Sequence, residues 1–359
     1  MKKLKNIMLG ILIVTTIIIV VGCSLYNYSL TPPKNSKEVV EIEIPNGYRA
    51  KQIAKLLKEK KLIRNEKIFL VYVKLMDKTN LKAGTYRISY NTGVKKIVDI
   101  LEKGTTYNPE EVTITFKEGK TMRDIARTIE ANTNNSYDSV IEKSNDIDYI
   151  NTLIEKYWFI TDDVKNNELY YKLEGYLFPD TYAFKNKDVT VEEIFNKMIA
   201  EMAKKLEPYK QDINKSKLSV HEILTLASMV EKESYDDMEQ KKNVASVFMN
   251  RLSAGMSLGS DVTALYANKI DGSRAMYNQE LYLKSPYNTR LTDGSMNGKL
   301  PIGPIATISI KSLEAAINPN ETSYLFFIAN IKTKETFFYQ YSSDFEAKKV
   351  ELKEVNRGM

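Results

Sequence analysis

The sequence predicts an α+β protein with an N-terminal transmembrane helix, small α+β segments after it, and a mixed α+β domain at the C-terminal end. Three observations predict this organisation: an uncharged apolar run near the N-terminus, short alternating stretches typical of strands, and longer stretches with helical spacing. The chain has 359 residues, of which 43% are hydrophobic and 27% charged, enough for two or three domains with an ample core. The expected segments are 1–36, 37–107, 108–215 and 216–359.

The first segment predicts a membrane anchor. Lysines among the first five residues precede an apolar run from Ile7 to Leu25, and no charge follows until Lys34. Such a run is long enough to span a bilayer, and its basic end stays in the cytoplasm. Cys23, the only cysteine, ends a stretch that resembles a weak lipobox, so a lipidated Cys23 is the alternative to an intact helix. Both interpretations place the rest of the chain at the outer face of a membrane.

Segment 37–107 predicts a small α+β module. The expected elements are strands 38–44 and 84–90 and helices 50–60, 65–76 and 94–103. Two interpretations remain open: the module binds glycans in the manner of a LysM motif, or it holds the following domain away from the membrane.

Segment 108–215 opens with the same pattern as residues 38–60. Strand 111–116, a turn at Gly119 and helix 121–130 repeat the order of strand, glycine turn and helix, which indicates an internal repeat.

The rest of segment 108–215 contains one long predicted helix, over residues 191–206. Residues 132–148 are polar and predict a loop with a short helix. The stretch from Glu174 to Phe184 is rich in aromatic rings, which is typical of a sugar-stacking cleft wall or of a well-packed turn.

The stretch from Ser219 to Glu233 predicts the central helix of the chain. Ser219 followed by Glu222 is a capping-box pattern. The apolar stripe of this helix consists of Val220, Ile223, Leu224, Ala227 and Val230. At ~100° per residue, Glu231 falls roughly 20° from Val220 and therefore inside the stripe, whereas Glu222 and Glu233 fall on the opposite side.

An inward carboxyl at Glu231 indicates acid catalysis. An apolar environment disfavours ionisation, so the pKa of this group is expected to rise above the ~4.3 of a free glutamate. A protonated glutamate near neutral pH can donate its proton to a glycosidic oxygen. The alternative is a structural side chain that reaches water or pairs with an arginine.

The rare residues exclude several chemistries. The chain has one cysteine and one histidine, and His221 is expected to be an exposed residue. This excludes Ser-His-Asp and Cys-His triads and makes metal sites implausible, and no phosphate-binding glycine motif is present. The net charge of +6 is spread evenly, so no nucleic-acid partner is expected. A weakly basic surface suits an anionic polymer, a membrane or plain solubility. The sequence predicts no cofactor.

Further candidate residues follow the central helix. Arg251 lies in the apolar stripe of predicted helix 239–252, where it needs an acidic partner or an anionic ligand. Polar loops beyond it suit either sugar contacts or plain connections. The candidates there are Asp261, Thr263, Tyr287, Asn288 and Thr289. The last expected elements are a helix around 313–316, strands 324–328 and 336–339, and a charged terminal helix.

Four stretches together resemble the endolytic murein transglycosylase (YceG-like) family. They are Leu81-Lys82-Ala83-Gly84-Thr85-Tyr86-Arg87, Glu174-Gly175-Tyr176-Leu177-Phe178-Pro179-Asp180-Thr181, Leu226-Ala227-Ser228-Met229-Val230-Glu231-Lys232-Glu233 and Val244-Ala245-Ser246-Val247-Phe248-Met249-Asn250-Arg251-Leu252. Shorter matches at 261–263, 287–289 and 300–305 follow in the family's order. Gly259 and Ile302 depart from the usual residues, and Asp344-Phe345-Glu346 stands where many members have a histidine.

The resemblance implies a membrane-anchored enzyme with a LysM-like subdomain that cuts nascent peptidoglycan strands internally. It implies cleavage of the β-1,4 bond between N-acetylmuramic acid and N-acetylglucosamine, with 1,6-anhydro ends and termination of strand elongation. The catalytic glutamate of the family motif falls on Glu231. The candidates for substrate binding or support are Glu174, Arg251, Asp261, Thr263, Tyr287, Asn288 and Thr289. The implied partners are glycan strands, the cytoplasmic membrane and peptidoglycan synthases.

Two other functions remain open at this point. A muramidase would use Asp261 or Glu174 to activate water, because hydrolysis needs a second carboxylate. A wall-binding scaffold would need no catalytic group.

Overall fold

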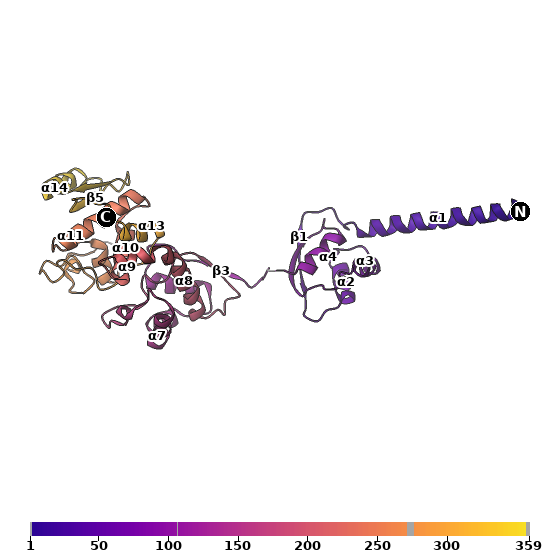
Figure 1. Cartoon of the computed structure of the whole chain (residues 1–359), viewed down its shortest axis with the longest axis horizontal. Coiled ribbons are helices and arrows are strands. Elements are labelled where there is room, and N and C mark those ends of the chain that lie inside the picture. Colours follow the sequence, from indigo (N-terminus) through magenta and orange to yellow (C-terminus); the bar gives the residue numbers. More distant parts are fainter. Residues whose placement is uncertain (1, 106, 271–275, 357–359) are drawn as a thin grey trace. The chain divides into compact units, whose positions relative to one another are not determined.

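The computed structural model describes residues 2–105, 107–270 and 276–356, and it has the mixed α+β composition that the sequence predicted. The chain divides into two units, Met1–Glu110 and Glu111–Met359, and each is described by itself (Figure 1).

The N-terminal unit begins with the long helix α1, Lys2–Leu30, as the apolar run predicted. Its part from Asn6 to Leu30 is long and apolar enough to cross a membrane, and none of it is buried within the protein. Cys23 lies exposed on this helix. An apolar helix without protein cover is typical of a membrane span or a signal sequence.

The remainder of this unit is a two-stranded antiparallel sheet with helices. Strand β1, Val39–Ile44, pairs with β2, Gly84–Ser89. The helices are α2, Ala50–Glu59, α3, Glu66–Leu75, and α4, Val94–Lys103. Alternate strand residues such as Ile42 and Ile44 enter the core with Leu57, because successive side chains of a strand point to opposite faces.

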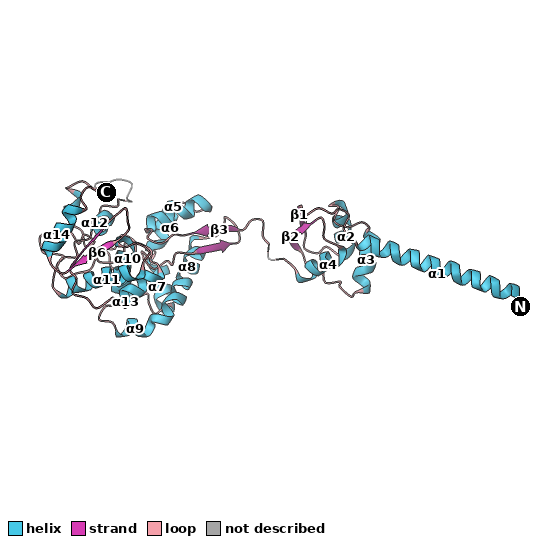
Figure 2. Cartoon of the chain, turned by 90° about the horizontal axis from the view of Figure 1, so that it is seen from above, coloured by secondary structure: helices cyan, strands magenta, loops and turns pink. Residues whose placement is uncertain are grey.

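The second unit opens with a similar arrangement. Strand β3, Val112–Thr115, pairs antiparallel with β4, Thr181–Phe184, and α5, Met122–Asn132, packs beside β3 (Figure 2). Gly47 and Gly119 both have positive φ, +85° and +67°, so each copy of the strand, turn and helix pattern bends through a glycine.

Between β3 and β4 the chain is more helical than predicted. The elements are α6, Tyr137–Asn145, α7, Ile147–Lys156, and a 3-10 turn, Asp162–Lys165. The short helix expected within 132–148 is present as α6, whereas α7, which begins at the end of this stretch, was not predicted. Ser136 and Asp146 cap these two helices with their side chains, so the polar residues mark helix starts rather than a loop. The long helix α8, Val191–Leu206, follows β4 as predicted.

Helix α10, Val220–Glu233, is the centre of the rest of the unit and packs against α13, α11 and α12. Those helices are α11, Met238–Ser253, α12, Asp261–Ala267, and α13, Ile310–Ile317. The remaining elements are 3-10 turns Glu207–Tyr209 and Glu280–Tyr282, α9, Lys210–Lys215, strands β5, Phe326–Ala329, and β6, Thr336–Tyr339, and α14, Ser342–Glu351. One hydrophobic core joins the expected segments 108–215 and 216–359, running from Ile114 to Ala316.

Candidate active site

Glu231 lies in the last turn of α10, on a helix whose start is built as predicted. The Ser219 hydroxyl accepts a hydrogen bond from the Glu222 backbone N–H at 3.2 Å, and the Glu222 carboxylate accepts one from the Ser219 N–H at 2.7 Å. This reciprocal capping fixes the register of the helix. The Glu231 side chain is only 11% exposed, so the prediction that it points inward is confirmed.

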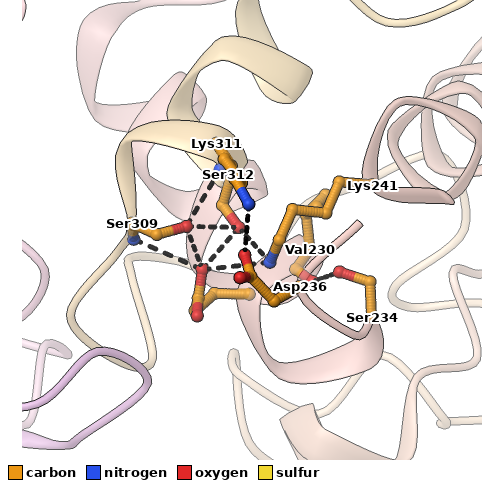
Figure 3. A network of polar contacts seen from close by, with 8 residues as sticks. Val230, Ser234, Asp236, Lys241, Ser309, Lys311 and Ser312 are labelled. Atoms are coloured by element: carbon orange, nitrogen blue, oxygen red, sulfur yellow. Dashed lines mark hydrogen bonds and ion pairs between the residues drawn. The ribbon is translucent and has the colours of Figure 1, made fainter. Parts of the chain in front are cut away.

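Four donors meet on one oxygen of this carboxyl. Glu231 Oε2 accepts hydrogen bonds from the Ser309 N–H at 3.3 Å, the Ser309 hydroxyl at 2.6 Å and the Ser312 hydroxyl at 2.5 Å. The Lys241 ammonium completes the set at 3.2 Å and also donates to Ser312 at 2.9 Å. Figure 3 shows Ser309, Ser312 and Lys241 converging in this network. We call these three residues the Glu231 cradle.

The cradle corrects the expected environment of Glu231. The sequence predicted an apolar surface or an arginine partner, whereas the structure places two hydroxyl groups and a lysine that is only 2% exposed around Oε2. Removing either member of such a buried pair leaves an uncompensated charge. Within the part of the chain that the structure describes, no hydrogen bond goes to Oε1. The cradle therefore fixes the carboxyl through one oxygen only.

A second carboxylate, Glu118, lies beside Glu231 and was not predicted from the sequence. Its loop is tied to Thr307: the Gly119 and Lys120 N–H groups donate to the Thr307 carbonyl and hydroxyl, both at 3.0 Å. A Cβ on Gly119 would lie 3.8 Å from Glu231 Cγ. Burial raises the pKa of Glu118, and the charge of Glu231 raises it further. The one feature of the sequence that could have drawn attention to Glu118 is the repeated glycine turn, because Glu118 directly precedes Gly119.

His221 differs from its predicted position, and Glu233, on the side opposite the apolar stripe, is also engaged by the protein. His221 is buried, not exposed: its Nδ1 contacts the Tyr176 hydroxyl at 2.7 Å and its Nε2 the Ile302 carbonyl oxygen at 2.9 Å. Glu233 accepts a hydrogen bond from the Ser260 hydroxyl at 2.5 Å, and burial raises its pKa. The prediction for His221 assumed that the side of α10 away from the apolar stripe meets solvent. In the structure, neighbouring segments also pack against part of that side.

Glu174 is 2% exposed, and its oxygens are held within the protein. They accept hydrogen bonds from the Met122 N–H, at 2.9 and 3.0 Å, and from the Tyr266 hydroxyl at 2.9 Å. Burial raises the pKa of Glu174 to about 7 despite these hydrogen bonds, which lower it. Glu174 thus joins α5 to α12 and presents no free oxygen to a ligand.

Among the described residues, Arg251 pairs with no acidic side chain. Its guanidinium donates to the carbonyl oxygens of Leu325 at 2.6 Å and Leu258 at 2.8 Å, and it lies over the Phe326 ring. Carbonyl dipoles therefore satisfy this arginine in place of an acid or an anion, because a guanidinium has several donors to distribute. Arg251 fastens β5 to the end of α11.

The other candidates form a buried support below α12. Tyr287, Asn288, Thr289 and Thr263 are each 0% exposed. The Thr263 and Thr289 hydroxyls contact each other at 2.8 Å, and the Asn288 amide donates to the carbonyls of 281 and 283 at 3.0 and 2.9 Å. Asp261, by contrast, is exposed and pairs with Arg290. Because the buried side chains offer no atom to solvent, their contribution in this structure is to hold the loops.

No group of three or more His, Cys, Asp or Glu side chains among the described residues is placed to hold a metal ion. The side chains that surround Glu231 carry carboxyl, hydroxyl and ammonium groups.

The model of the YceG-like family matches residues 42–351. The chain belongs to the YceG-like family.

Three relatives illustrate the similarity to this family. The chain is 38% identical over 323 residues to an endolytic murein transglycosylase of Bacillus subtilis, covering 89% of this chain and 87% of the relative. It is 32% identical over 324 residues to one of Streptococcus pneumoniae, where it spans 58% of the longer protein. A crystal structure of a YceG-like protein from Listeria monocytogenes matches with a TM-score of 0.61 and 36% identity, over 87% of this chain and 100% of that one.

Proposed function

We propose that this YceG-like protein is an endolytic lytic transglycosylase of peptidoglycan. The observation that carries the proposal is the Glu231 carboxyl, held through Oε2 by Ser309, Ser312 and Lys241 with Oε1 left over. A carboxyl that is fixed on one side only is suited to passing a proton to a bound substrate and back. The family relatives named endolytic murein transglycosylase support the substrate class.

In the proposed reaction, Glu231 protonates the oxygen of the β-1,4 bond between N-acetylmuramic acid and N-acetylglucosamine. The ionised Glu231 then takes the proton from the C6 hydroxyl of the same muramic acid, whose oxygen closes onto C1. Because the attacking hydroxyl belongs to the substrate, its effective concentration is high and no activated water is needed. The products are a 1,6-anhydromuramic acid end and a free N-acetylglucosamine end, so a growing strand is terminated.

We further propose where this reaction takes place. Helix α1 anchors the chain in the cytoplasmic membrane with both units on the outer face, and the sheet-and-helix module around β1 and β2 binds glycan in the manner of a LysM motif. Peptidoglycan synthases, which supply nascent strands, are the expected protein partners. If Cys23 is lipidated instead, the location is the same.

A muramidase is the second candidate function, because Glu118 could serve as its second carboxylate. Hydrolysis needs a base for water. Both oxygens of Glu174 are engaged internally and Asp261 pairs with Arg290, so Glu118, whose loop touches Glu231, is the better candidate for that base.

The test of the proposed function is digestion of purified glycan strands by the detergent-solubilised chain, followed by mass spectrometry. We expect fragments from within the strands that end in 1,6-anhydromuramic acid. Reducing muramic acid ends, which are heavier by one water, would refute the transglycosylase and support the muramidase.

Changing Glu118 to Gln is expected to move the alkaline limb of the pH profile of kcat/KM to lower pH. Groups facing Glu118 are Glu231, Asp236, Lys241 and Lys311. Burial and the charge of Glu231 raise the pKa of Glu118, so Glu118 keeps a proton at the site to higher pH than a free glutamate would. Glutamine at this position cannot hold that proton, and we expect the limb to move by about half a pH unit or more.

The matched control for this measurement is Glu207→Gln, which removes the same charge from the exposed turn after α8. A Glu118→Gln profile that superimposes on the wild-type profile would contradict the coupling. Loss of activity at every pH, together with reducing ends in the wild-type products, would instead identify Glu118 as the base of a hydrolase.

A further inference from the structure

Two lysines line one cavity whose wall at Gly119 lies close to Glu231. Lys120 comes from the loop before α5 and Lys232 from the end of α10, and both line a cavity of about 80 Å³. At roughly 10–15 Å³ per water molecule, this is space for several waters or for a small substituent of a ligand. The lining also includes Asp124 and four apolar residues, Val262, Leu265, Ile270 and Ile305.

The positive charge at this cavity is only partly balanced within the protein: the charges of Asp124, Glu231 and Glu174 act on Lys232, but none of the three forms an ion pair with it. Asp124, the acid that lines the cavity, is engaged elsewhere: one oxygen contacts Arg127 at 3.1 Å, and the other accepts hydrogen bonds from the Thr121 N–H and hydroxyl, both at 3.1 Å. Over the described ranges, neither Lys120 nor Lys232 has an ion-pair partner.

The two ammonium groups act on each other. Burial lowers the pKa of Lys232 and the neighbouring Lys120 lowers it further, against the opposite effect of Asp124, Glu231 and Glu174. Lys232 donates to the Gly119 carbonyl at 3.2 Å, a neutral acceptor that leaves its charge in place. An anion between the two lysines would relieve this repulsion, and a charge-assisted hydrogen bond to each would be stronger than a neutral one.

The cavity is linked to Glu231 through Gly119. Gly119 is part of its wall, and a Cβ at Gly119 would lie 3.8 Å from both Glu231 Cγ and Lys232 Cδ. A substrate whose bridging oxygen meets Glu231 would therefore bring its nearest substituent to Lys120 and Lys232. The apolar side of the cavity, formed by Val262, Leu265, Ile270 and Ile305, suits carbon atoms next to the charge.

We propose that Lys120 and Lys232 form a subsite for a carboxylate carried by the muramic acid that is cleaved. This inference rests on the proposed function and adds that the enzyme recognises the acidic substituent of the sugar. The carboxylate has two possible sources with the same chemistry: the lactyl group itself in strands without peptides, or a free carboxylate of the peptide stem in substituted strands.

The test compares the full chain with Lys120→Met, Lys232→Met and the double variant on three substrates. These are strands with stems, strands stripped of stems, and stripped strands whose lactyl carboxyl has been converted to a methylamide. We expect each substitution to raise KM by about tenfold on the substrate that supplies the carboxylate, the size of one charge-assisted contact, with a smaller change in kcat. On the methylamide strands the KM difference from wild type should largely vanish.

The substrate that responds identifies the source of the carboxylate. A rise in KM on stripped strands assigns it to the lactyl group, and a rise only on strands with stems assigns it to the peptide. Lys217→Met, which removes one exposed lysine before α10, is the matched control and should keep the wild-type KM. Lys120→Met is the cleaner variant, because Lys232 also holds the Gly119 carbonyl.

An unchanged KM for the double variant on all three substrates would overturn the subsite. If the wild-type chain cleaves no strand, the proposed function is refuted but the subsite is still testable. The measurement is then the binding of fluorescent stripped strands. Weaker binding by the double variant, but not by Lys217→Met, would support the subsite, and equal binding would refute it.

Discussion

Glu231→Gln is expected to lower kcat/KM on glycan strands by about 10³-fold or more while the protein still folds. The amide can accept hydrogen bonds from Ser309 and Ser312 as the carboxylate does, but it can neither donate an acid proton nor recover one. The measurement is release of soluble fragments from purified strands, with circular dichroism to verify the fold.

The stability of this variant provides an internal check. Lys241 is 2% exposed and would lose its charge partner, so we expect the free energy of unfolding to fall by about 1–3 kcal/mol. Adding Lys241→Met removes the unpaired charge and should restore much of that loss without restoring activity. A folded Glu231→Gln protein with wild-type activity would contradict the assignment of Glu231. Equal wall turnover and strand length in cells with either protein would favour the wall-binding scaffold.

Gly175→Ala is expected to destabilise the second unit by about 3–5 kcal/mol. Gly175 has φ +78°, where a side chain is strained, and an added Cβ would lie 2.3 Å from Pro304 Cβ and 2.8 Å from Pro304 Cγ. A proline ring next to backbone cannot move aside as a flexible side chain does. The neighbour Glu174 would also be displaced from Met122 and Tyr266.

The measurement is urea-induced unfolding followed by the fluorescence of Trp158, the only tryptophan of the chain, which lies in the second unit. Gly255→Ala is the matched control, since Gly255 has φ +65° but nothing within 4 Å of an added Cβ. The free energy of unfolding of this control should fall by about 1 kcal/mol, from backbone strain alone. Equal losses for the two variants would show that the contact with Pro304 relaxes and that the overlap is not the main effect.

Sequence periodicity predicted the helices well where an apolar stripe or a cap marks them. Helices α4, Val94–Lys103, and α8, Val191–Leu206, have the expected bounds, and α10 begins at the predicted capping box. Helix α7 was missed, although a short helix was expected within 132–148, because such short helices depend on polar caps and on packing against neighbours that are distant in sequence.

Local pattern alone also determined that Glu231 points inward, since this follows from its angle to the apolar residues of the same helix. What surrounds it was decided by the tertiary structure. Lys241 comes from α11, Ser309 and Ser312 from α13, and Glu118 from the loop after β3. A helical period defines a direction from one helix axis, but it carries no information about which distant segments fold against that face. The cradle, the second carboxylate and the lysine pair therefore emerge only when those segments pack around α10.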